Sequence, residues 1–401
     1  MPHKIFIIAC EPSGDLHGSN LVKELLKQDP GLEIFGLGGP RMAEAGVRLL
    51  FDMTGISTLG LGDVLRQYFK YRKIFYETLQ EVERLQPDAL VLIDSPAFNL
   101  RFAKKIKKRF PVIYYISPQI WAWGARRIHT IKKNVSKMIA ILPFEVPIYE
   151  KAGIPCTFVG HPLLDQVQAS SDRSTLRERF GIRTGECAIA LCPGSRETEV
   201  RRILPAMLEA ARELRRFIPT SVFLVTLSPN VPEKICREIL KHFPYIRTHA
   251  SADHFYDILA AMDFSLIASG TATLEAALLE APFFLLYKAS GSTYFLGRHL
   301  VRVKFLGLAN LLAGKSVVPE FIQDLNPVEI ANKVKAFLED PEAQETMKEE
   351  FRKVRGKLGE AGASQKAARA VLESLQTQDK KPETKDRTPK TAEPRASAPS
   401  H

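Results

Sequence analysis

Two short turns in the second half of the chain combine the residue types that bind phosphates. One lies within Ala190–Arg196 and the other within Ile267–Glu275, and each leads from an apolar run into a predicted helix. A helix start presents free N–H donors and a partial positive charge, so a small-residue turn there lets an anion approach the backbone closely. The guanidinium group of Arg196 adds a positive charge and can donate two parallel hydrogen bonds to phosphate oxygens. Each turn alone is equally an ordinary helix cap, but together they favour a diphosphate, and therefore a nucleotide.

An acidic residue ends an apolar strand in the first half of the chain. Asp94 directly follows the run Ala89–Ile93, and Pro96 then opens a helix. Open parallel sheets gather their polar groups at such strand ends, and a carboxylate placed there can act as a general base. The alternative is that Asp94 only caps the helix that follows it.

Two further groups of residues are candidates for the ligand-binding cleft, which in open parallel sheets lies beyond the carboxyl ends of the strands. Glu11, Ser13, Gly14 and Asp15 form the first strand-to-helix corner and are expected to face the cleft, although capping by Ser13 or Asp15 is an equal alternative. Glu275 lies one turn into the helix after the second phosphate turn. It is placed to accept hydrogen bonds from a ribose, and the alternative is a solvent-facing helix glutamate.

We expect no metal and no other cofactor. The chain has no Asp-x-Asp pair in a nucleotide-binding loop and no cluster of histidines and cysteines. Arg196 and the helix-terminal N–H groups can supply the charge stabilisation that a cation supplies elsewhere. His17 and His161 are expected near the cleft as structural histidines. The five cysteines are widely spaced and form no Cys-x-x-Cys pair, which fits a reducing compartment.

The elements that must position these residues alternate between strand and helix. Apolar strands are expected at 3–9, 33–38, 89–93, 112–116 and 137–141, with helices near 15–28, 62–86, 96–109 and 124–133. The pattern begins again with strands near 187–191, 221–226, 245–248, 263–267 and 282–286. This alternation predicts an α/β protein with two tandem Rossmann-like, doubly wound parallel sheets that face a cleft.

The chain of 401 residues, 45% hydrophobic and 25% charged, has the length for two domains. We expect an N-terminal Rossmann-like domain at 1–165 and a C-terminal Rossmann-like domain at 166–326. Residues 327–375 are predicted to form helices that pack across both domains. The segment 376–401 holds four prolines and ten charged residues and is predicted to be a disordered tail.

The net charge of +11 is unevenly distributed, because no acid lies between Asp94 and Glu145 while eleven lysines and arginines do. Such a field favours phosphates, nucleic acid or an anionic membrane. No apolar stretch reaches the roughly 18–20 residues of a membrane span, and the first strand starts too early for a signal sequence, so we expect a cytoplasmic protein. The stretch 56–76 predicts a basic amphipathic helix at a membrane surface, with an ordinary core helix as the alternative; its membrane or acyl residues would be Leu61, Leu65, Phe69, Tyr71, Arg72 and Lys73.

Several stretches together carry a family resemblance: Glu11–Asp15, Gly38–Met42, Ile93–Asn99, Ser117–Trp123, Leu142–Glu145, Val159–Leu163, Asn310–Gly314 and the two phosphate turns. In this order and spacing the chain resembles the lipid-A-disaccharide synthases, which are inverting glycosyltransferases of the GT-B fold. The resemblance runs from about residue 4 to residue 372. It implies that the N-terminal domain faces the acceptor and the membrane, with Glu11, Ser13, Gly14 and Asp15 on the acceptor side, and that the C-terminal domain binds the UDP-sugar.

The resemblance implies a reaction and its partners. A 2,3-diacylglucosamine unit would pass from UDP to the 6-hydroxyl of 2,3-diacylglucosamine 1-phosphate (lipid X), giving lipid A disaccharide 1-phosphate and UDP. The enzyme would sit peripherally on the cytoplasmic face of the inner membrane, against its inner leaflet, with no nucleic acid as partner. The oligomeric state is left open, a homo-oligomer through the C-terminal helices included.

The resemblance also implies roles for single residues. Asp94 falls on the family's catalytic aspartate, and Arg196 falls on its essential arginine. The chain has Ala97 where a second acid often follows, so Asp94 would act singly or with another partner, and it has Cys10 where glycine is usual. The implied UDP site comprises Gly194, Ser195, Arg196, Ser269, Gly270, Thr271, Glu275 and Asn310.

Two other readings stay open at this point. Another GT-B enzyme acting on UDP-sugars, such as a UDP-N-acetylglucosamine 2-epimerase or a MurG-like transferase, would share the fold but lacks the patterns at Ile93–Asn99 and Ser117–Trp123. A nucleic-acid-binding protein would use the basic half of the chain and bind in a salt-sensitive way, but it explains neither phosphate turn.

Overall fold

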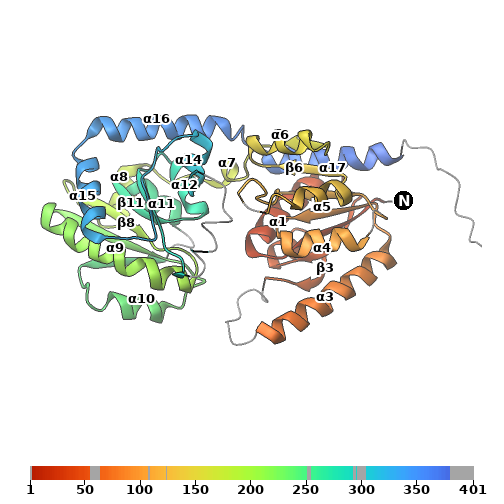
Figure 1. Cartoon of the computed structure of the whole chain (residues 1–401), viewed down its shortest axis with the longest axis horizontal. Helices are drawn as coiled ribbons and strands as arrows, with labels where there is room; N and C mark the ends of the chain where they lie inside the picture. Colours follow the sequence, from red (N-terminus) through yellow and green to blue (C-terminus); the bar gives the residue numbers. More distant parts are fainter. Residues whose placement is uncertain are drawn as a thin grey trace, which may run out of the picture.

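Two parallel β-sheets, each covered by helices, make up the protein, and the chain passes between them near residues 160 and 360 (Figure 1). The computed structural model describes residues 2–54, 64–106, 109–122, 124–250, 254–291, 295 and 304–379. The predicted α/β class with two doubly wound sheets is confirmed.

The N-terminal sheet has seven described strands in the order β3-β2-β1-β4-β5-β6-β7, all parallel where they pair. Its strands are β1 (Lys4–Ala9), β2 (Glu33–Gly38), β3 (Arg48–Asp52), β4 (Ala89–Ile93), β5 (Val112–Tyr115), β6 (Lys137–Ala140) and β7 (Cys156–Phe158). Its helices are α1 (Pro12–Gln28), α2 (Pro40–Glu44), α3 (Val64–Leu85), α4 (Pro96–Ile106), α5 (Arg127–Asn134) and α6 (Val146–Lys151), with a 3₁₀ turn at Pro143–Glu145.

The C-terminal sheet has six described strands in the order β10-β9-β8-β11-β12-β13. Its strands are β8 (Cys187–Cys192), β9 (Ser221–Leu227), β10 (Ile246–Ala250), β11 (Phe264–Ala268), β12 (Phe283–Tyr287) and β13 (Glu320–Ile322). The remaining helices are α7 (Leu163–Gln166), α8 (Arg173–Arg179), α9 (Glu197–Phe217), α10 (Glu233–Leu240), α11 (Phe255–Ala261), α12 (Thr271–Leu278), α14 (Leu308–Ala313), α15 (Pro327–Leu338), α16 (Pro341–Lys357) and α17 (Ala363–Asp379).

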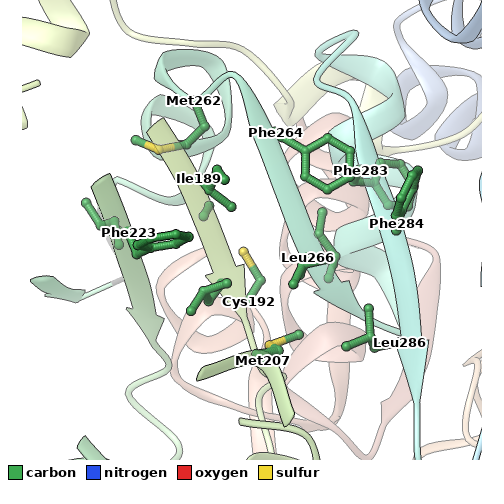
Figure 2. Close-up of a cluster of buried hydrophobic side chains, with 14 of the residues drawn as sticks. Ile189, Cys192, Met207, Phe223, Met262, Phe264, Leu266, Phe283, Phe284 and Leu286 are labelled. Atoms are coloured by element: carbon green, nitrogen blue, oxygen red, sulfur yellow. The ribbon is translucent and has the colours of Figure 1, made fainter. Parts of the chain in front are cut away.

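Burial on both faces explains the composition of the central strands. All five residues of β4 are buried, and so are all five of β11. A strand covered by helices on both sides is apolar throughout rather than alternating, and these runs are continuous in the sequence. In the C-terminal domain the side chains of β8, β9, β11 and β12 interlock in one core, in which Phe264 lies edge-on to Phe284 (Figure 2).

In both sheets the strand order reverses at a topological switch point. β1 lies beside β4 with Ala9 opposite Ile93, and β8 lies beside β11 with Cys192 opposite Ile267. From each of these neighbours the connections run outward in opposite directions, which opens a crevice beyond the carboxyl ends of the two strands. Ligand sites of open α/β sheets form at such crevices.

The C-terminal helices tie the two domains together. Helix α15 packs on α9, α16 packs on α12 and α14, and α17 returns to lie against α1 of the N-terminal domain (Figure 1). The N–H of His161 donates to the carbonyl of Leu358, so the two connections between the domains are hydrogen-bonded to each other. Helix α17 ends at Asp379, so our predicted tail boundary was wrong by one helical turn, and the rest of that tail, 380–401, lies outside the described residues.

The contact between the domains is apolar. Leu142 and Leu163 of the N-terminal side pack with Leu274 of α12, Leu312 of α14 and Leu358 after α16. None of the helices in the described parts of the chain has the length and hydropathy needed to span a bilayer.

Candidate active site

Asp94 stands at the switch point of the N-terminal sheet, directly after β4. Its backbone has φ 46° and that of Ser95 has φ 43°, so two successive residues with side chains adopt the left-handed conformation. Such conformations cost about 1–3 kcal/mol each and persist only where the surroundings hold them. The strain turns the chain sharply between β4 and α4 and leaves the Asp94 side chain at the carboxyl edge of the sheet.

Two buried side chains hold this strained peptide. The hydroxyl of Tyr114 in β5 donates to the carbonyl oxygen of Asp94 at 2.5 Å. The amide of Asn99 in α4 donates to the same oxygen at 2.8 Å and to the carbonyl of Ile93 at 3.0 Å. Tyr114 and Asn99 have no exposed surface. We predicted no role for either residue, although Asn99 ends one of the quoted motifs, because their role depends on the pairing of β4 with β5 and on the turn geometry.

The carboxyl of Asp94 titrates close to neutral pH. Burial and the neighbouring charge of Glu11 raise its pKa from 3.8 to about 6, although the N–H of Ser95 acts in the opposite direction. A base with a pKa near the working pH is suited to proton transfer. Glu11, rather than a residue at position 97, is therefore the acid that influences Asp94, and Ala97 is exposed.

The Glu11 corner lies beside Asp94 because β1 and β4 are neighbours. Glu11 and Ser13 are exposed, and the N-cap of α1 has no side-chain hydrogen bond, so neither caps this helix. Gly14 is buried against Ala9, where an added Cβ would lie 3.3 Å from the Ala9 Cβ.

Asp15, the fourth residue of that corner, caps a different helix. Its carboxylate accepts hydrogen bonds from the N–H groups of Gly39, Met42 and Arg41 at 2.7, 3.0 and 3.2 Å. It thereby satisfies the start of α2, and both of its oxygens are engaged within the protein. Glu11 and Ser13 remain the exposed side chains of the corner.

The first phosphate turn connects β8 to α9 in the C-terminal domain. Gly194 has φ 108°, a left-handed conformation that favours glycine. Ser195 and Arg196 follow it and are exposed, and 77% of the Arg196 side chain is accessible to solvent. The guanidinium of Arg196 lies 2.9 Å from a carboxylate oxygen of Glu199.

The second turn connects β11 to α12 at the same edge. Because Cys192 and Ile267 pair across β8 and β11, the two turns leave the sheet side by side, as we expected. Gly270 and Thr271 are exposed at the start of α12. The N–H of Ser269 donates to Leu286 within the sheet, so only its hydroxyl is a candidate for a ligand.

Glu275 is half-buried near the start of α12. It accepts a 3.3 Å hydrogen bond from the hydroxyl of Tyr256, and burial raises the pKa of its carboxyl to about 7. Its charge also acts on the thiol of Cys192 at the end of β8. Glu275 is thus only partly exposed and lies close to the first phosphate turn, and its contact with a ribose stays a prediction.

Asn310 is buried and fully hydrogen-bonded within the protein. Its amide nitrogen donates to the carbonyl of Val318 and to Glu320, and its oxygen accepts from the N–H groups of Val317 and Val318, all at 2.7–2.9 Å. Glu320 in turn accepts from the N–H groups of Leu306 and Gly307 at the start of α14. The side chain has no group left for a ligand, and it holds the loop that follows α14.

A pocket of about 560 Å³ lies between the domains. Trp121 and Phe144, in T-shaped contact at 5.2 Å, line it from the N-terminal domain, and Leu311 and Leu312 line it from α14. The Trp121 indole donates to the buried carboxylate of Glu145, whose pKa is raised to about 7 by burial. Sequence reasoning gave Glu145 no role, although it ends one of the quoted motifs.

Five of the six proposed membrane residues, Leu65, Phe69, Tyr71, Arg72 and Lys73, belong to the outer helix α3 (Figure 1). Leu61 lies outside the described residues, as does the side chain of Leu65. Phe69, Arg72 and Lys73 are exposed. Tyr71 is half-buried and packs against the core.

The histidines near the cleft are neutral at ordinary pH. Burial lowers the pKa of both His17 and His161 to about 4. His161 Nδ1 accepts from the N–H of Leu163 beside the connection between the domains, in keeping with the expected structural role. Within the described residues no three side chains of His, Cys, Asp or Glu gather as a metal site would require.

Comparison with protein families relates nearly the whole chain to one of them. The family model for lipid-A-disaccharide synthetase matches residues 5–373. The lipid-A-disaccharide synthase of Syntrophus aciditrophicus is 41% identical over 379 residues, which cover 94% of this chain and 98% of that protein. The enzyme of the same name from Geobacter sulfurreducens is 40% identical over 375 residues, 93% of this chain and 97% of that protein.

Solved structures with the same fold are more distant in sequence. The UDP-GlcNAc 2-epimerase from Neisseria meningitidis, bound to UDP-GlcNAc, is 14% identical with a TM-score of 0.61 and covers 94% of this chain and all of its own. The glycosyltransferase of kitacinnamycin is 15% identical with a TM-score of 0.60 over the same shares. At these identities the likeness extends to the GT-B fold alone.

Proposed function

The chain belongs to the lipid-A-disaccharide synthetase family of glycosyltransferases, and from this premise we propose the reaction that its site performs. A 2,3-diacylglucosamine unit passes from UDP to the 6-hydroxyl of 2,3-diacylglucosamine 1-phosphate. The products are the β-1,6-linked disaccharide 1-phosphate and UDP. The observation that carries the proposal is the pairing of switch points, one with a strained, near-neutral carboxyl and the other with two phosphate turns.

Asp94 is the base in this proposal. As the acceptor O6 attacks C1 of the donor sugar, the carboxylate of Asp94 takes the hydroxyl proton. The bond between C1 and the phosphate oxygen breaks on the opposite face, and its electron pair leaves with UDP, so the configuration at C1 inverts. The raised pKa of Asp94 supports this role because a more basic carboxylate accepts the proton more readily.

The two turns of the C-terminal domain hold the leaving diphosphate. Negative charge grows on its bridging oxygen as the bond to C1 breaks. The guanidinium of Arg196 and the N–H groups at the starts of α9 and α12 are donors suited to that charge. Gly194, Ser195, Ser269, Gly270 and Thr271 shape the turns. Glu275 accepts hydrogen bonds from the ribose, and we now give Asn310 the role of holding α14 and its following loop in place.

The acyl chains require a lipid surface beside the cleft. We infer that the enzyme attaches peripherally to the inner leaflet of the inner membrane, on its cytoplasmic face. Helix α3 carries exposed Phe69 and Tyr76 next to the cationic side chains of Arg72 and Lys73, a combination that binds anionic lipid headgroups.

Mass spectrometry of a defined reaction tests the function. Purified protein is incubated with UDP-2,3-diacylglucosamine and 2,3-diacylglucosamine 1-phosphate, with the Asp94→Asn variant alongside. Formation of the disaccharide 1-phosphate by the wild type, and at most a trace by the variant, supports the proposal. Consumption of the UDP-sugar without disaccharide would point instead to an epimerase, whose fold this chain shares. No consumption with several acyl lengths would refute the proposed reaction.

A further inference from the structure

A carboxylate of the protein itself occupies the anion-binding position of the first phosphate turn. Oε2 of Glu199 accepts hydrogen bonds from the N–H groups of Ser195 and Arg196 at 3.2 and 3.3 Å. Its other oxygen, Oε1, accepts from the Arg196 guanidinium at 2.9 Å. One side chain therefore engages the two backbone N–H donors and one guanidinium nitrogen of the first turn, which are part of the donor set that we assign to the UDP diphosphate.

The turn brings Glu199 close to the backbone because Gly194 has no side chain. A Cβ added at Gly194, which has φ 108°, would lie 2.5 Å from Glu199 Oε2. Ser195 and Arg196 are exposed, so an anion from solvent can reach the same donors once Glu199 moves away. Glu199 stands three residues into α9, where a rotation of its side chain needs no change in the backbone.

We propose that Glu199 is an internal competitor of the diphosphate, an intramolecular anion that UDP must displace from the Ser195 and Arg196 donors. The inference rests on the proposed function, which places the diphosphate at this turn. Two anions cannot share these donors, because each N–H points at one acceptor and the like charges repel at contact distance. Binding of UDP thus exchanges one set of charge-assisted hydrogen bonds for another.

The competitor has two consequences for the reaction. It keeps the turn and the Arg196 side chain arranged as if an anion were bound, which lowers the reorganisation needed when the donor arrives. It also favours release of UDP after transfer, because the returning carboxylate recovers its hydrogen bonds. A single phosphate, with fewer contacts than a diphosphate, is less able to displace it.

Titration calorimetry with UDP on four proteins tests this. Beside the wild type we use Glu199→Gln, Glu199→Ala and the control Glu197→Gln. Glu197 is a carboxylate of the same helical turn, but it pairs with Arg201 at 2.7 Å. Its replacement removes the same charge from the helix start without freeing the donors. A glutamine at 199 keeps a capping oxygen for the helix, so it stays informative even if the alanine variant fails to fold.

We expect both Glu199 variants to bind UDP about three- to tenfold more tightly than the wild type. The control Glu197→Gln should change the affinity for UDP by less than Glu199→Gln does. Inorganic pyrophosphate should show the same gain as UDP, whereas uridine, which has no phosphate, should show none. Product inhibition by UDP should strengthen in parallel.

The outcomes separate this inference from the proposed function. If the wild type binds UDP and the Glu199 variants bind it equally or more weakly, the competitor role is wrong and the diphosphate site stands. A gain that extends to uridine would indicate a general loosening of the turn and also overturns the competitor. If none of the four proteins, the wild type included, binds UDP, the diphosphate site itself is wrong, and the role of Glu199 is refuted with it.

Discussion

Tyr114 donates its phenolic hydrogen to the carbonyl oxygen of Asp94 over 2.5 Å, from the strand next to the one that Asp94 ends. The bond is made to the backbone and not to the carboxylate. Tyr114 therefore acts on the direction in which the Asp94 side chain leaves the sheet, by stabilising a left-handed backbone that would otherwise relax. Tyr114 therefore does not occupy the carboxylate oxygens to which we assign the acceptor hydroxyl.

Replacing Tyr114 with phenylalanine should lower kcat by about tenfold and leave KM for the UDP-sugar nearly unchanged, because small misplacements of a catalytic group affect the chemical step. Steady-state kinetics measures both values. Tyr115→Phe is the matched control: it removes the same atom from the neighbouring residue, whose ring lies in the core on the other face of the sheet. Equal kcat values in the two variants would contradict a positioning role for Tyr114.

Asp94→Asn should reduce turnover by roughly 10²–10⁴-fold, because an amide cannot accept the acceptor's proton. Binding of UDP should stay within about twofold, since we assign the diphosphate to the other domain. Asp88→Asn is the control. Asp88 precedes the same strand at its opposite end, where it accepts from the N–H of Lys4 at 2.7 Å. An Asp94→Asn enzyme with wild-type turnover would exclude Asp94 as the base.

The central part of the fold could be predicted from the sequence because its signals are local. Strands β4 and β11 are continuous apolar runs, since helices cover both of their faces, and each phosphate turn has small residues where a helix begins. The expectation that both turns serve one ligand needed only the alternation of strands and helices. The register of β8 and β11 agrees with it.

Other features have no local signal. The short strands β3, β7 and β13 lie at sheet edges or beside them, and their three to five residues are too few to show a period. The partners of Asp15 are 24 to 27 residues away, at the start of α2. Asn310 is bonded to a loop that only the folded chain brings back to it. Such contacts depend on tertiary packing, so a residue's type alone left several roles open.

The pH dependence of the enzyme should follow Asp94. Its pKa of about 6 means that kcat/KM is constant above that pH and falls about tenfold per unit below it, as the base becomes protonated. A pH–rate profile measures this decrease in kcat/KM. A decrease that begins only near pH 4 would show that burial and Glu11 do not raise the pKa of Asp94 as described.

The raised pKa of Asp94 also predicts how this residue affects the stability of the folded protein. The folded state holds the Asp94 proton more tightly than the unfolded state, so the ionised carboxylate destabilises the fold as pH rises from 3.8 through about 6. Asp94→Asn should therefore have a higher Tm than the wild type above pH 6, and the difference should vanish below pH 4. Thermal unfolding at pH 4 and pH 8 makes the comparison. A lower Tm of the variant at pH 8 would contradict the predicted sign.

Arg196→Ala should reduce turnover by about 10²-fold or more, because the charge on the departing UDP loses its cationic partner. UDP affinity should fall as well, by about tenfold. The control is Arg201→Ala, because this arginine of α9 is also exposed, with 51% of its side chain accessible, but pairs with Glu197. For both variants, calorimetry measures the UDP affinity and steady-state kinetics measures turnover. Unchanged values for Arg196→Ala would place the diphosphate elsewhere.

Attachment to a membrane should depend on helix α3. The side chain of Phe69 is 59% exposed and that of Tyr76 is 47% exposed, and the Arg72 guanidinium lies 5.9 Å from the centre of the Tyr76 ring. The wild type should sediment with vesicles rich in anionic lipid at low salt and be released as salt screens the charges, since the Debye length is about 10 Å at 0.1 M. The double variant Phe69→Ser, Tyr76→Ser should bind these vesicles at least about tenfold more weakly than the wild type.

Phe217→Ser is the control for this membrane prediction, because it removes a phenylalanine of similar exposure, 41%, from the C-terminal domain. Equal binding of the double variant and the control would remove α3 as the membrane contact, and absence of wild-type binding to anionic vesicles at low salt would refute peripheral attachment.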